Sequence, residues 1–139
     1  MTERDPAKLI WSLSGSGTGT TISGSGNSGG WSNTGITPNQ LSGLDLRFAD
    51  DLALYVYAGG VTGSPSFKVS IDGYDDLGNL FPALAATASI TGTGAAAPVY
   101  IGRHGGGSGS YVVLPQWGRV SWTCTGGSVT GAEIALWAR

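Results

Sequence analysis

Charge and cysteine are both scarce in this sequence of 139 residues, and each shortage excludes a class of protein. Charged residues make up 12% of the chain, well below the usual share. The few basic residues are scattered, so the sequence offers no concentrated positive surface for direct binding to nucleic acid. The single cysteine, Cys124, excludes an intramolecular disulfide. Its place in an alternating stretch predicts a small buried side chain rather than a nucleophile.

Long apolar runs are also missing. No run approaches the roughly 20 residues that a membrane-spanning helix needs, so we expect no membrane partner. Residues 1–11 carry charges of both signs and lack the apolar stretch of a secretory signal. We therefore expect a protein that stays in the cytoplasm in which it is made, unless it becomes part of a larger assembly.

Recognisable catalytic groups are equally few. His104 is the only histidine, and it lies in the glycine-rich stretch 102–110 with no group nearby in sequence to orient its ring. One histidine and one cysteine cannot supply a transition-metal site. Asp45 and Glu133, both on expected strands, leave a glycoside hydrolase as a third-ranked alternative. The sequence predicts no enzyme, no catalytic residue, no metal and no cofactor.

One acidic segment, "DGYDDLGN", is a candidate calcium site. Asp72, Asp75, Asp76 and Asn79 offer oxygen ligands, but their spacing departs from that of an EF-hand loop. Asp and Asn also favour turns, because their side chains bond to the nearby backbone. We predict a hairpin turn here, with calcium binding as the alternative.

Glycine is abundant, and hydrophobic residues alternate at a period of two along much of the chain. The stretches 52–57 and 67–72 each place aliphatic or aromatic side chains on one face and mostly polar or tyrosine side chains on the other. Helical periodicity is nearly absent, and residues 79–90 are the best candidate for it. The pattern predicts an all-β, antiparallel β-sandwich or jelly-roll-like fold, with seven to nine short strands and glycine-rich loops.

The chain divides, by this interpretation, into an N-terminal arm at residues 1–13 and a single β-sandwich domain at 14–139. The arm holds too few apolar residues to form a core, so we expect a neighbouring chain to order it. Residues 14–35 favour a strand–loop–strand arrangement anchored by Trp31, with a flexible Gly-Ser linker as the alternative.

The last alternating stretches flank Gly126 and Gly127, and they predict a terminal β-hairpin. Its inward face would carry four apolar side chains, and Trp137 would point away from the core. Together with the arm and the outward tyrosines, Trp137 suggests a contact surface for a partner or, alternatively, a platform for a sugar. The expected inward residues are Val120, Trp122, Ile134 and Leu136. The expected partner-binding residues are Leu9, Ile10, Trp11, Tyr55, Tyr57 and Trp137.

The segment "LPQWGRVSWT", Leu114 to Thr123, is followed by a Thr-Gly-rich stretch and a last strand. In this final quarter the chain resembles small virion proteins that decorate the capsids of tailed bacteriophages of actinobacteria. The resemblance implies a virion location after assembly in the host cytoplasm, no catalysis, and docking on the major capsid protein or other virion proteins. It also implies a homo-oligomer, commonly a trimer. A phage tail protein and a carbohydrate-binding β-sandwich module are the alternatives.

Overall fold

The computed structural model describes residues 8–19, 21–25, 44–47, 49–75, 77, 79–102 and 114–139. Within these ranges the chain is all-β without a helix, and every strand pairing is antiparallel, so the predicted fold class is confirmed. No helix in this described part is long and apolar enough to cross a membrane. The strands are β1 (Lys8–Gly19), β2 (Thr21–Ser25), β3 (Leu44–Asp45), β4 (Asp51–Ala58), β5 (Gly60–Tyr74), β6 (Leu80–Ala86), β7 (Gly94–Ala95), β8 (Val99–Gly102) and β9 (Trp117–Ala138).

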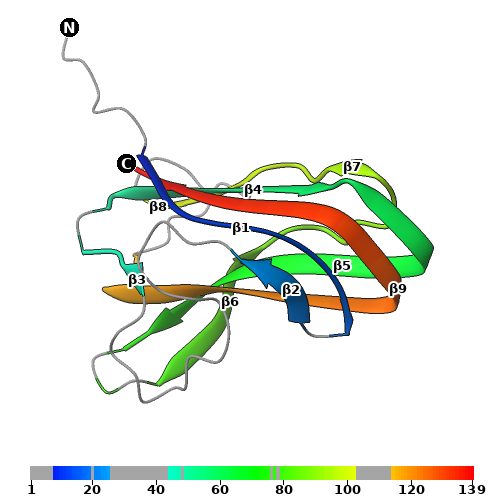
Figure 1. The fold of residues 1–139 in the computed structure, drawn as a ribbon. Coiled ribbons are helices and arrows are strands. Elements are labelled where there is room, and N and C mark those ends of the chain that lie inside the picture. The colour runs from blue at the N-terminus through cyan, green and yellow to red at the C-terminus, as the bar shows by residue number, and fades with distance from the viewer. Residues whose placement is uncertain are drawn as a thin grey trace, which may run out of the picture.

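The fold is built around a long bent ribbon. β4 and β5 follow one another across Gly59 and run antiparallel to β9 along almost its whole length, from Leu52 opposite Ala138 to Tyr74 opposite Trp117. β1 pairs with the other edge of β9, and β2 pairs with β1. Figure 1 shows the ribbon curling so that its two arms lie over one another, an arrangement compatible with a sandwich. We call the arm with β4 and the end of β9 the upper arm, and the arm with β5 and the start of β9 the lower arm.

The terminal hairpin predicted around Gly126 and Gly127 is wrong, because β9 runs through both glycines without reversing. At this point the register between β5 and β9 shifts by one residue, between Gly63 and Ser66. Gly126 has a φ of +77°, and a Cβ there would lie 2.6 Å from the carbonyl oxygen of Ser64. Glycine inside a strand often marks such a bulge or a sheet corner. Here the glycines therefore bend a strand instead of ending it.

The N-terminal segment also differs from expectation. Lys8 to Leu13 form the first half of β1 and pair with Ala138 to Ile134 of the same chain, so the boundary expected at residue 13 falls inside a strand. Strand structure continues through 14–19 and 21–25, the first part of the Gly-Ser segment. Residues 1–7 and 26–43, including Trp31, lie outside the described residues.

The core lies between the two arms of the curled sheet. The predicted inward faces are confirmed, with Leu52, Leu54 and Val56 buried on β4 and Phe67, Val69 and Ile71 buried on β5. Trp122 is 7% exposed and Cys124 is fully buried, as their alternation on β9 predicts. The remaining buried hydrophobic residues of this cluster are Leu44, Leu46, Ala58, Ile90, Ile101, Val120, Val129, Ala132, Ile134, Leu136 and Ala138.

β6 occupies most of the segment that was the best helix candidate. It pairs with β5, and after it Ile90 exchanges backbone hydrogen bonds with Phe67. The predicted turn between β5 and β6 is confirmed at Asp75, whose carboxylate accepts bonds from the backbone N–H of Leu77 and of Asn79 at 2.9 and 2.8 Å. Asp76 lies outside the described residues.

Candidate functional site

Large apolar side chains gather on the outward face of the upper arm. Leu9 lies opposite Trp137, Trp137 lies opposite Ala53, and Ala53 lies opposite Tyr100, so one row crosses β1, β9, β4 and β8. Residues directly opposite in an antiparallel pair share a face of the sheet. Tyr55 and Tyr57 continue that face along β4 because side chains alternate along a strand. We call Leu9, Tyr55, Tyr57, Tyr100 and Trp137 the aromatic face.

The aromatic face is open to solvent. Tyr55, Tyr57 and Tyr100 are 42%, 44% and 44% exposed, and Leu9 is 39% exposed. Trp137 is half-buried. Clusters of large apolar side chains on one surface are uncommon in isolated soluble domains and mark contact sites. The outward orientation predicted for Tyr55, Tyr57 and Trp137 is thereby confirmed, while their binding to a partner stays a prediction.

A shallow hollow lies beside the two tyrosines of β4. It has a volume of about 260 Å³ and is lined by Tyr55, Tyr57, Pro98, Glu133 and small residues including Ala95 and Ala135. In the strand register Tyr57 lies opposite Glu133, and Tyr55 lies opposite Ala135. Because these neighbouring side chains are small, the tyrosine side chains project beyond them from the surface of the sheet.

Tyr55 and Tyr100 form a pair within the aromatic face. Their ring centroids are 6.3 Å apart and the ring planes are 86° to one another, which is the edge-to-face geometry that aromatic rings favour. A hydrogen bond with the Tyr100 side chain and partial burial both raise the pKa of Tyr55 above its ordinary value of 10.0. The Tyr55 phenol is therefore neutral throughout the physiological pH range.

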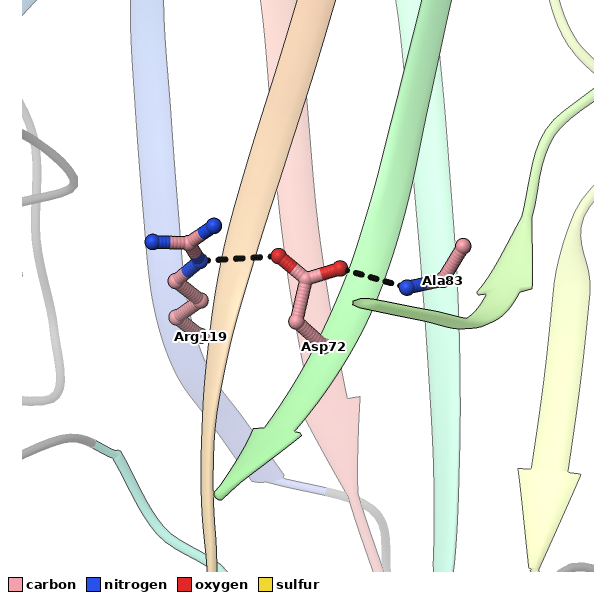
Figure 2. A network of polar contacts seen from close by, with 3 residues as sticks. All are labelled: Asp72, Ala83 and Arg119. Carbon is pink, nitrogen blue, oxygen red and sulfur yellow. Dashed lines mark hydrogen bonds and ion pairs between the residues drawn. The ribbon is translucent and has the colours of Figure 1, made fainter. Parts of the chain in front are cut away.

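The strongest polar network of the described residues lies in the lower arm (Figure 2). Asp72 is 1% exposed, and its carboxylate accepts bonds from Arg119 Nε at 2.8 Å and from the backbone N–H of Ala83 at 2.7 Å. Ala83 has a φ of +54° and lies where the β5–β6 register is irregular. The expectation that Asp72 faces solvent or helps to form the turn is therefore wrong. It ties β5, β6 and β9 together instead.

Tyr74 extends this network. Burial raises the pKa of Tyr74, and the nearby Arg119, which also hydrogen-bonds to it, partly opposes that rise. Burial alone would lower the pKa of Arg119, but its bonds to Asp72 and its proximity to Tyr74 outweigh that effect and raise it. The negative charge of Asp72 favours the ionised form of Arg119. The network stabilises the fold and leaves no carboxylate oxygen of Asp72 open for a ligand.

The acidic residues of the candidate calcium site have different partners. Asp75 bonds to the turn backbone and to the side-chain amide of Asn79 at 2.8 Å, whereas Asp72 points to Arg119. In the described ranges no group of three or more His, Cys, Asp or Glu residues is placed to hold a metal ion. Asp45 pairs with Trp117 and Glu133 pairs with Tyr57, so the two acids sit on different arms of the bent ribbon.

The other residues singled out in the sequence do not lie on the aromatic face or lie outside the described part. Ile10 is partly buried and packs against the chain's own core, so it does not belong to the aromatic face. The backbone of Trp11 pairs with Leu136, and its side chain, like all of His104, lies outside the described part. Sequence reasoning missed Tyr100, although alternation against its neighbour Ile101 was a signal that it points outward.

The arrangement can offer aromatic stacking, apolar contact and one carboxylate to a partner. Burial also raises the pKa of the Cys124 thiol, which favours its unreactive protonated form. The chain was compared with models of protein families, with curated proteins and with solved structures, and none of them matches it.

Proposed function

We propose that this chain is a non-enzymatic structural protein of a tailed-bacteriophage virion, and that it decorates the capsid by docking its aromatic face on the major capsid protein. The resemblance of Leu114–Thr123 to capsid decoration proteins supports this assignment. The observation that carries it in the structure is the row of exposed and half-buried apolar side chains across β1, β9, β4 and β8. By the same resemblance the protein acts as a homo-oligomer, commonly a trimer.

The chemistry of the aromatic face suits a protein contact. Tyrosine and tryptophan are enriched at interfaces, because they bury a large area while fixing few torsion angles, and they often dominate the binding energy. Small side chains such as Ala53 and Ala135 separate the rings and leave room for side chains of a partner. Low surface charge lowers the desolvation cost of bringing two proteins together.

A particle-binding experiment tests the proposal. Particles of the phage that encodes the chain, stripped of it or grown without it, are mixed with purified protein and sedimented. The double variant Tyr55→Ala/Tyr57→Ala should lose affinity by at least about tenfold, since a central interface aromatic contributes about 2 kcal/mol or more. Lys68→Ala, which changes an exposed residue on the outside of the lower arm, should dock like the wild type.

Two results would overturn the proposal. One is wild-type protein that does not sediment with particles at any concentration at which it stays folded. The other is label on tails and none on heads when the bound chain is located by electron microscopy, which would favour a tail protein. Unchanged docking of the double tyrosine variant would refute only the role of the aromatic face, and the docking function would stand.

A further inference from the structure

The hollow beside Tyr55 and Tyr57 holds a carboxylate that forms no ion pair with the described basic side chains. Glu133 is exposed, and it is the one carboxylic acid among the described residues that line the hollow, which include no basic residue. No ion pair joins Glu133 to a basic side chain within the described part of the chain. Arg119 and Arg139 pair with Asp72 and Asp51, and the Arg47 guanidinium lies over the Trp117 ring.

The aromatic walls add to the same field. A tyrosine ring carries partial negative charge on its faces, so a cation near those faces is attracted by about 0.5–1 kcal/mol at an exposed site. Tyr55 and Tyr57 both line the hollow, and the register places Glu133 directly opposite Tyr57. Two tyrosine rings and a carboxylate around one small space form a site that favours a cation.

We infer that this hollow receives the cationic end of a lysine or arginine side chain from the partner protein. The inference rests on the proposed docking function, because that function supplies a partner, and it adds the chemistry that the partner must present. The stem of the basic side chain contacts Pro98 and the alanines of the floor, and the charged end lies between the tyrosines and Glu133. Long basic side chains bury their apolar stem and keep the charge at a polar group in this way.

A neutral sugar fits the lining less well. Sugar hydroxyls need several donors and acceptors, and the lining side chains supply two phenols and one carboxylate but no amide, serine or basic group. The unbalanced carboxylate, by contrast, gains most from a positive charge. A sugar therefore stands as a competing outcome of the test.

The test uses the full chain, labelled with ¹⁵N, and follows amide signals during titration with small probes. The probes are Nα-acetyl-lysine methylamide and Nα-acetyl-arginine methylamide. Nα-acetyl-norleucine methylamide has a similar stem without the charge and serves as the neutral comparison. We expect both basic probes to shift the signals of Tyr57 and Glu133 and to bind at least about threefold more tightly than the neutral one.

Two pairs of variants locate the site. Glu133→Gln should remove most of the preference for the basic probes, whereas Asp50→Asn changes the net charge equally at an exposed residue away from the hollow and should keep it. Tyr57→Ala should weaken binding of the basic probes, whereas Phe81→Ala, which removes a ring that is 52% exposed on β6, should not. Far-UV circular dichroism of each variant checks that the fold is retained.

Several results would overturn the inference. Equal affinity for the neutral probe, or equal losses in Glu133→Gln and Asp50→Asn, would show that no specific cation site exists. Shifts at Tyr57 produced by methyl glucoside and not by the basic probes would favour a sugar. If the probes fail while particle docking still depends on Tyr55 and Tyr57, the cation site is wrong and the docking function stands. If the basic probes bind at the hollow and the protein does not dock on particles, the cation site stands and the docking function is wrong.

Discussion

Removing Arg119 should destabilise the protein more than its position near the surface suggests. In Arg119→Ala the carboxylate of Asp72, which is 1% exposed, keeps the Ala83 N–H but loses its only basic partner in Figure 2. Breaking a buried ion pair from one side costs about 3–5 kcal/mol, because a charge stays behind without compensation. Since Arg119 is itself 26% exposed, water can reach the vacated place, and we expect a loss near the lower end, about 3 kcal/mol.

The reverse change should cost less. In Asp72→Ala the guanidinium can turn towards solvent, and the main loss is the acceptor for the Ala83 N–H, which costs about 1–3 kcal/mol. The double variant leaves neither charge stranded, so its loss should fall below the sum of the single losses by about 1–3 kcal/mol. Arg139→Ala is the control. It breaks the more exposed pair with Asp51, at 3.3 Å, and should cost less than about 1 kcal/mol.

Urea unfolding measures each free energy, and an unchanged slope shows that only the stability has moved. Hydrogen exchange at Ala83 adds an independent reading. Its amide should exchange faster in Asp72→Ala and should stay protected in Asp72→Asn, which keeps an oxygen acceptor. Strictly additive losses, or equal losses for Arg119→Ala and Arg139→Ala, would refute the reasoning that Asp72 is a buried charge held by Arg119.

Three further predictions concern the core, the alkaline limit and the sheet corner. Trp122→Ala should cost about 3–5 kcal/mol in urea unfolding, because it empties a buried site. Trp137→Ala should unfold like the wild type and dock poorly on particles. A melting temperature of Trp137→Ala as low as that of Trp122→Ala would contradict this prediction. Because the folded pKa of Tyr74 is raised, its contribution to stability is complete below pH 10 and is lost as pH rises through the folded pKa. The loss of stability above pH 10 should therefore be smaller in Tyr74→Phe than in the wild type. Identical alkaline profiles for the two proteins would contradict this prediction. Gly126→Ala should cost at least about 1 kcal/mol, because the φ is +77° and a Cβ would meet a carbonyl oxygen, whereas Gly92→Ala has free space and should melt within a degree or two of the wild type.

Alternation in the sequence was enough to predict the strand faces but not the strand partners. Leu52, Leu54 and Val56 face the core because a period of two fixes which side each residue takes. The same period does not say which strand lies alongside. Gly126 and Gly127 are compatible both with a reversal and with a bend, and only the pairing of β9 with β5 over its whole first half decides for a bend.

The polar network escaped sequence reasoning for a related reason. Asp72 continues an alternating stretch and adjoins an acidic turn, so local rules place it at the surface. Its partner Arg119 is 47 positions away, and their contact exists only because β5 and β9 pair in one particular register. The candidate site was partly predictable: Tyr55, Tyr57 and Trp137 are large aromatics on the face opposite the core. Their grouping with Tyr100 and Leu9 depends on the order of strands across the sheet.

The bent ribbon has a consequence for how fast the protein folds. β4 and β5 are complete strands only when β9 lies beside them, yet β9 is separated from both in sequence by all of β6, β7 and β8. Such non-local pairing requires a long loop to close, and the entropy lost on closure slows folding. β-rich chains of this kind therefore typically fold in milliseconds to seconds. Until β9 docks, the edges of β4 and β5 remain open to strands of other molecules. We expect refolding yield to fall as protein concentration rises, even though the finished fold buries those same edges.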